Sequence, residues 1–127
     1  MTVAETCLLV ALVMPYVAVG LAKADPQYDN AQPRAWLATR SGWRARAVAL
    51  QANCFEALPL FVAAVLLAEF HHLSQAVTNG LAVLFVLLRL GYAAAYLSNR
   101  PTSRSVLWSL AAATAVGLLL AGCLSPN

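Results

Sequence analysis

The chain has 127 residues, of which 61% are hydrophobic and 10% are charged, and its formal net charge is +3. The mean hydropathy of +0.71 and the low charged fraction exclude an ordinary water-soluble globular protein, in which about a quarter of the residues are charged. At this length we expect a single domain, covering residues 1–127. The positive charge does not indicate nucleic-acid binding, because the basic residues flank apolar segments and form no nucleic-acid-binding module.

Four apolar segments follow one another along the chain, at residues 6–22, 47–68, 76–97 and 106–124. A helix that crosses the hydrocarbon core of a bilayer needs about 20 apolar residues, so each segment predicts a transmembrane helix. We expect the first segment to be a retained helix rather than a secretion signal, since no Lys or Arg precedes it and Glu5 stands where positive charge is expected. The sequence therefore predicts an all-α integral membrane protein, built as an up-down bundle of four transmembrane helices.

The basic residues alternate between the segments that connect these helices. Residues 69–75 contain no Lys or Arg, and the third connection, residues 98–105, contains Arg100 and Arg104. The first connection holds five basic residues: Lys23, Arg34, Arg40, Arg44 and Arg46. Positive charge is retained on the cytosolic side of membranes, which predicts cytosolic first and third connections and both termini outside. Tryptophan is enriched at the membrane–water interface, which predicts that Trp36 and Trp43 lie among the lipid headgroups.

A few polar side chains interrupt the apolar segments. They are Asn53 and Glu56 in the second segment, and Arg89, Tyr92 and Tyr96 in the third. An ionisable residue inside a membrane is unfavourable unless it faces the bundle, and it marks a functional site by default. At the helical rise of about 1.5 Å per residue, we expect Glu56 to lie level with Arg89 and Asn53 level with Tyr92.

Two interpretations of this polar group are open. Glu56 and Arg89 form a buried ion pair that fixes the helix register, with hydrogen bonds from Asn53 and the tyrosines. Alternatively, the group is a binding site for a small polar anion below a basic mouth. The mouth would consist of Arg46, Arg100 and Arg104.

Metal binding is not expected. Cys7, Cys54 and Cys123 all lie in apolar segments without the spacing of metal ligands. The pair His71-His72 lies in the shortest connection with no second pair of ligands beside it in the sequence.

Residues 46–61 resemble the signature of the MAPEG family, the membrane-associated proteins of eicosanoid and glutathione metabolism. The matching positions are Arg46, Gln51, Asn53, Glu56, Pro59 and Phe61. A second matching stretch continues from the third apolar segment into the fourth. It contains Arg89, Tyr92, Tyr96, Arg100, Pro101, Arg104 and Ser105. The length and the four segments also agree, so the chain resembles a bacterial-type member of this family along nearly its whole length.

The resemblance implies a homotrimer that binds glutathione between neighbouring chains, near the cytosolic side. It implies that Arg104 stabilises the glutathione thiolate, which attacks a lipophilic second substrate arriving from the membrane lipid. The function expected is that of a glutathione-dependent transferase or peroxidase, with glutathione as co-substrate and no metal. The residues expected to hold glutathione are Arg46, Gln51, Asn53, Glu56, Arg89, Tyr92 and Tyr96.

Two departures from the family pattern keep other functions open. Ala49 stands where glutathione-binding members commonly carry a basic residue, and Ala57 replaces a frequent aromatic residue. Each removes a possible ligand contact, and Ala49 in particular favours a second hypothesis, a non-catalytic membrane scaffold that has lost glutathione. A small proton-coupled exporter is the third hypothesis, but it requires a carboxylate accessible from both sides, whereas Glu56 is expected to face an arginine.

Overall fold

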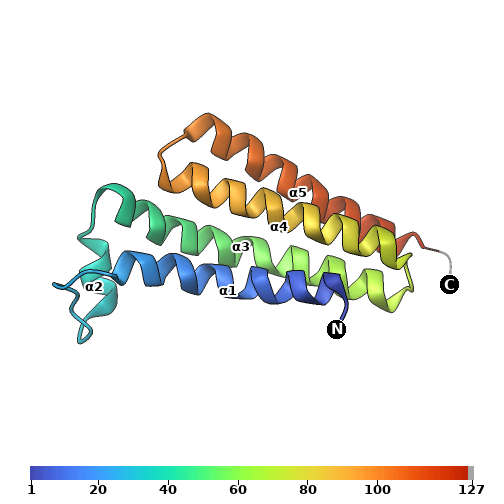
Figure 1. The fold of residues 1–127 in the computed structure, drawn as a ribbon, viewed down its shortest axis with the longest axis horizontal. Coiled ribbons are helices and arrows are strands. Elements are labelled where there is room, and N and C mark those ends of the chain that lie inside the picture. The colour runs from blue at the N-terminus through green and yellow to red at the C-terminus, as the bar shows by residue number, and fades with distance from the viewer. Residues whose placement is uncertain (126–127) are drawn as a thin grey trace.

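The computed structural model describes residues 1–125 and contains, within them, four long helices and one short one (Figure 1). The helices are α1 (Val3–Lys23), α2 (Pro33–Ala38), α3 (Gly42–Phe70), α4 (Gln75–Leu97) and α5 (Pro101–Cys123). All except α2 are long and apolar enough to cross a membrane. The predicted fold class is therefore confirmed: the chain is an all-α, multi-pass integral membrane protein whose long helices run alternately up and down.

The long helices extend beyond the apolar segments of the sequence. Helix α3 begins at Gly42 rather than at residue 47, and its 29 residues span about 43 Å at 1.5 Å per residue. The hydrocarbon core of a bilayer is only about 30 Å thick, so both ends of α3 reach into the headgroup layers. Helix α5 begins at Pro101, because the fixed φ of proline suits the first position of a helix.

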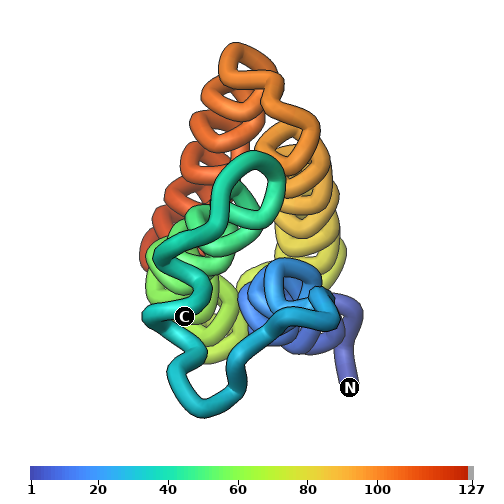
Figure 2. The backbone as a smooth tube through the Cα atoms, turned by 90° about the vertical axis from the view of Figure 1, so that its left-hand side faces the viewer, coloured from blue at the N-terminus to red at the C-terminus, as the bar shows by residue number. Residues whose placement is uncertain are grey.

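The first connection contains the short helix α2, which starts at Pro33 for the same reason. This connection and the turn at residues 98–100 lie at one end of the bundle, opposite the N-terminus (Figures 1 and 2). Figure 2 shows this end facing the viewer. Seven of the eight Lys and Arg residues lie between residues 23 and 46 or between 100 and 104, and we call this end the basic end.

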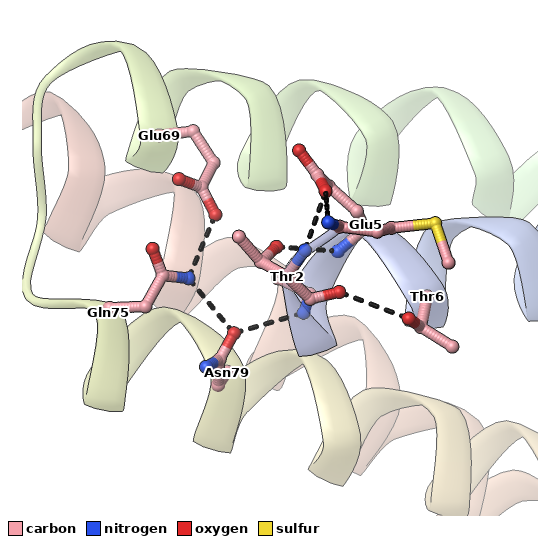
Figure 3. Close-up of polar contacts among 8 residues, drawn as sticks. Thr2, Glu5, Thr6, Glu69, Gln75 and Asn79 are labelled. Carbon is pink, nitrogen blue, oxygen red and sulfur yellow. Dashed lines mark hydrogen bonds and ion pairs between the residues drawn. The ribbon is translucent and has the colours of Figure 1, made fainter.

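The opposite end is held by side-chain hydrogen bonds that join three helices (Figure 3). The Oδ1 atom of Asn79 on α4 accepts from the backbone N–H of Ala4 on α1, at 3.0 Å. Gln75 Nε2 donates to the same oxygen and to Glu69 Oε1 of α3, both at 3.0 Å. Because these bonds occupy polar groups at the ends of α1, α3 and α4, they fix how the helices align.

The largest group of buried side chains fills the half of the bundle next to that end. Phe61 of α3 and Phe85 of α4 stack with their ring centroids 3.9 Å apart. Gly122 of α5 lies so close to α3 that a Cβ atom there would approach the backbone of Ala68 to 2.9 Å. We call this the packed half. Its core residues include Ala64, Val65, Ala82, Ala111, Ala115 and Leu118.

Candidate functional site

The contact between Arg46 and the end of α4 sets the register of the other half of the bundle. The Nε and Nη2 atoms of Arg46 donate to the carbonyl oxygen of Leu97, at 3.1 and 3.0 Å. Asn53 lies seven residues beyond Arg46, and Arg89 lies eight residues before Leu97. At about 1.5 Å per residue, both positions lie ~10–12 Å along their helices from this contact, so they face each other.

Arg89 of α4 is buried, and only 3% of its surface is exposed. Its Nη1 atom donates to Asn53 Oδ1 at 2.9 Å, and its Nη2 atom donates to the sulfur of Cys54 at 3.6 Å. The amide of Asn53 donates in turn to Glu56 Oε2, at 3.3 Å. Asn53 therefore connects the buried guanidinium to a carboxylate that is exposed on the surface of the chain.

The predicted pairing of Glu56 with Arg89 is therefore wrong, because Arg89 donates to Asn53 and is joined to Glu56 only through the Asn53 amide. Within residues 1–125 the ion pairs join Met1 to Glu5 and Arg44 to Asp25, and Glu56 is in neither. The expected level follows if Glu56 is counted inward from Arg46 and Arg89 inward from Ser98. The Arg46–Leu97 contact instead aligns Arg89 with Asn53.

Two tyrosines of α4 continue the polar group toward the basic end. The guanidinium carbon of Arg89 lies 4.4 Å from the ring centroid of Tyr92, and Tyr92 meets Tyr96 edge to face at 5.5 Å. Arg104, in the first turns of α5, places its guanidinium carbon 4.6 Å from the centroid of Tyr96. These contacts form a continuous series of guanidinium, ring, ring and guanidinium, and cation–π attraction holds both arginines in place.

Two cavities border this group. One of about 130 Å³ is lined by Asn53, Glu56 and Arg89 together with Trp108 of α5. The other, of about 150 Å³, is lined by Tyr92, Arg104, Ser105, Ser109 and again Trp108. The Trp108 indole thus lies between a cavity that contains the carboxylate and a cavity that contains the arginine of α5.

The structure brings most of the predicted site residues together, and it adds two that sequence reasoning missed. We call the half of the bundle that holds them the polar half. It contains Arg46, Asn53, Cys54, Glu56, Arg89, Tyr92, Tyr96, Arg104 and Trp108. Trp108 lies four residues after Arg104 and so shares its helical face, a spacing that identifies it in retrospect. The contact of Cys54 with Arg89 joins two helices and has no signal in the sequence.

Gln51 and Arg100 are the predicted residues that remain apart from this group. Gln51 is partly buried on α3 and lines neither of the two cavities. Arg100 is exposed and immediately precedes α5, and it also lines neither cavity. Of the three arginines of the predicted mouth, Arg46 binds a backbone carbonyl and Arg104 lies on Tyr96.

The chemistry of the polar half suits a small ligand that carries both signs of charge. Glu56 supplies an accepting carboxylate, Asn53 an amide, and Arg89 and Arg104 two fixed positive charges. The two arginines exceed the single carboxylate, so an anionic group is favoured. Residues 1–125 contain no group of three His, Cys, Asp or Glu side chains placed to hold a metal ion.

Comparison with known families gives one match. The model of the MAPEG family matches residues 3–124 of the chain. No curated protein and no solved structure matches the chain.

Proposed function

Since the match covers residues 3–124, the chain belongs to the MAPEG family, and we propose that it is a membrane-bound, glutathione-dependent transferase or peroxidase acting on lipophilic electrophiles. The family is one of membrane proteins of glutathione-related transferase and peroxidase type. The observation that carries the proposal is the series Arg89–Tyr92–Tyr96–Arg104. It places two fixed guanidinium groups beside two cavities that share Trp108, one lined by Arg89 and Glu56 and the other by Arg104.

The side chains of the polar half match the charged groups of glutathione. The tripeptide has one amino group, two carboxylates and a thiol. Glu56 accepts from the amino group, and Asn53 and Arg89, which are already hydrogen-bonded to each other, orient the backbone and one carboxylate. Arg104 lies by the thiol, where a fixed positive charge favours the thiolate over the neutral form and so lowers the pKa of the sulfur.

Neither cavity alone has room for a tripeptide. Binding sites for small molecules usually enclose about 300–1,000 Å³. The two cavities measure about 130 and 150 Å³, and Glu56 at the edge of the first is exposed. A neighbouring copy that covers Glu56 and Trp108 would complete the site, which supports a homotrimer with glutathione held between its chains.

The reaction follows from the thiolate and the surrounding lipid. The thiol loses its proton to water, and the sulfur attacks an electrophilic carbon to form a carbon–sulfur bond. The displaced group leaves with the electron pair of the bond that breaks. A lipophilic substrate partitions into the bilayer and so approaches the site from the surrounding lipid.

The proposal is tested by measuring glutathione with the protein purified in detergent. We expect heat of binding and ultraviolet absorbance of the thiolate at neutral pH, where free glutathione is a thiol. Removing one fixed donor to a developing anion commonly lowers turnover by about 100-fold, so Arg104→Gln should lower conjugation to that extent. Arg34→Gln removes the same charge from the first connection and should change the rate by less than about twofold. Absence of both the binding heat and the thiolate absorbance would defeat the proposal.

A further inference from the structure

A further polar cavity lies away from the two cavities of the polar half, where α2 ends and α3 begins. It measures about 200 Å³ and is lined by Thr39, Arg40, Ser41 and Arg44. We call it the arginine pocket. None of its residues lines either cavity of the polar half, so its ligand is a question separate from glutathione.

Both arginines of the pocket are held in place by their neighbours. The guanidinium carbon of Arg40 lies 4.0 Å from the ring centroid of Trp36, and its Nη2 atom donates to Thr39 Oγ1 at 2.8 Å. Arg44 lies 4.7 Å from the ring centroid of Trp43. Guanidinium groups fixed in this way lose little further conformational freedom when they bind an oxyanion.

Contacts of Arg44 with the end of α1 complete this arrangement. Its Nη2 atom donates to the carbonyl oxygen of Ala24 and pairs with Asp25 Oδ2, both at 3.2 Å. The contacts use the same nitrogen, so the rest of the guanidinium is left for another acceptor.

Two buried donors of the pocket have no acceptor within residues 1–125. The Nε–H groups of Arg40 and Arg44 are buried and make no hydrogen bond. A buried donor without an acceptor is unfavourable, and nearly all such groups in proteins have a partner. Both guanidinium groups line the pocket, so an oxyanion with several oxygens in it would accept charge-assisted hydrogen bonds of the kind that arginine forms with phosphate.

Position and charge identify the oxyanion. Helix α3 is longer than the hydrocarbon core, so its first turn lies in the headgroup layer. Tryptophan is enriched in this layer, which agrees with the positions of Trp36 and Trp43 beside the pocket. Arg40 and Arg44, less the charge of Asp25, leave one net positive charge, which matches a phosphodiester rather than a doubly charged free phosphate. We propose that the arginine pocket binds the phosphodiester of an anionic membrane lipid.

The experiment is native mass spectrometry of the full chain in a non-ionic detergent, with added phosphatidylglycerol, phosphatidylcholine or inorganic phosphate as probes. We expect one phosphatidylglycerol per chain to be retained. Phosphatidylcholine should be held more weakly, because its choline cation opposes Arg40. In Arg40→Gln, affinity for phosphatidylglycerol should fall about tenfold, the size of one lost charge-assisted hydrogen bond.

The matched control is Arg34→Gln, since Arg34 is an exposed arginine of the same connection outside the pocket. It should change lipid affinity by less than about twofold. Equal losses in Arg34→Gln and Arg40→Gln would show diffuse attraction to charge and overturn the proposal, as would an unchanged affinity in Arg40→Gln. Retention of inorganic phosphate in preference to the lipid would also overturn it, by assigning the pocket to a soluble anion. Circular dichroism and thermal unfolding of each variant establish that it is folded.

Discussion

The packed half and the polar half of the bundle contain the same helices but join them in different ways. In the packed half, α3 and α5 approach until Gly122 contacts the backbone of Ala68, and two phenylalanine rings stack between α3 and α4. In the polar half, the helices are joined by long side chains, with Arg46 bound to Leu97 and Arg89 bound to Asn53. A cavity borders Asn53, Glu56 and Arg89 and ends against Phe85, Ala111 and Ala115 of the packed half.

The difference separates stability from chemistry along a single helix. In a membrane, helices associate through close packing of small residues and through hydrogen bonds, because lipid tails are as apolar as the side chains. Helix α3 contributes Phe61, Ala64 and Ala68 to the packed half, and Arg46, Asn53 and Glu56 to the polar half. We therefore expect substitutions in the first set to change unfolding, and substitutions in the second set to change ligand binding.

The largest effect on stability is expected for Phe61→Ala. Phe61 is fully buried and stacked on Phe85, so the substitution leaves a cavity and removes the ring contact. Its free energy of unfolding in mixtures of SDS and detergent should fall by about 3 kcal/mol. Phe55→Ala, at a phenylalanine of the same helix that is 42% exposed, should lower it by less than about 1 kcal/mol. If the two losses were equal, burial in this half would not be what stabilises the bundle.

Gly122→Ala should have the next largest effect. The added methyl group would lie 2.9 Å from Cα and N of Ala68, where only backbone movement can make room. Overpacking of this kind lowers the free energy of unfolding by about 2 kcal/mol. Gly117→Ala is the matched control on the same helix, since its Cβ meets nothing within 4 Å. The control should be neutral or more stable by about 0.5 kcal/mol, because alanine is the better helix former. Equal stability of the two variants would contradict the close approach of α3 and α5.

The fold could be predicted from the sequence because the bilayer imposes a length and a polarity on every spanning helix. Hydropathy located all four long helices, but it placed the start of α3 at residue 47, because Arg44 and Arg46 lower the local hydropathy. The helix nevertheless continues outward to Gly42, since backbone hydrogen bonds persist in the headgroup layer. Helix α2 has only six residues, too few for a periodic signal.

The candidate site could be predicted from the sequence only in part. Asn53, Glu56, Arg89 and Tyr92 stood out because polar residues are rare in apolar segments. The pairing of Arg89 with Asn53 could not be predicted, because it depends on the Arg46–Leu97 contact between two helices and not on spacing within either one. Sidedness of the membrane and the homotrimer stay predictions, from the charge of the connections and from the family respectively.

Arg89→Met sharpens the comparison between the two halves, because it should separate binding from stability. The substitution removes a buried charge, whose desolvation opposes folding, together with its hydrogen bonds to Asn53 and Cys54, so the two effects on stability oppose each other. The free energy of unfolding should change by less than about 1 kcal/mol, whereas glutathione affinity measured by calorimetry should fall about tenfold, through the lost hydrogen bonds to a charged group. Leu90→Met on the lipid-facing side of α4 should alter neither quantity. A large loss of stability without any loss of binding would assign Arg89 to the fold alone.

The smallest effect, and the one that addresses the departure from the family pattern, is expected for Ala49→Arg. Ala49 lies one turn before Asn53 on α3 and is partly buried, so an arginine there would extend toward the same cavity as Glu56. A new charge-assisted hydrogen bond, less the entropy of ordering the side chain, should tighten glutathione binding about fivefold. Ala49→Met adds similar length without charge and should leave the affinity within about twofold. If the wild-type chain binds no glutathione but Ala49→Arg does, the polar half keeps the geometry of the site without its ligand, and the scaffold hypothesis gains over the transferase.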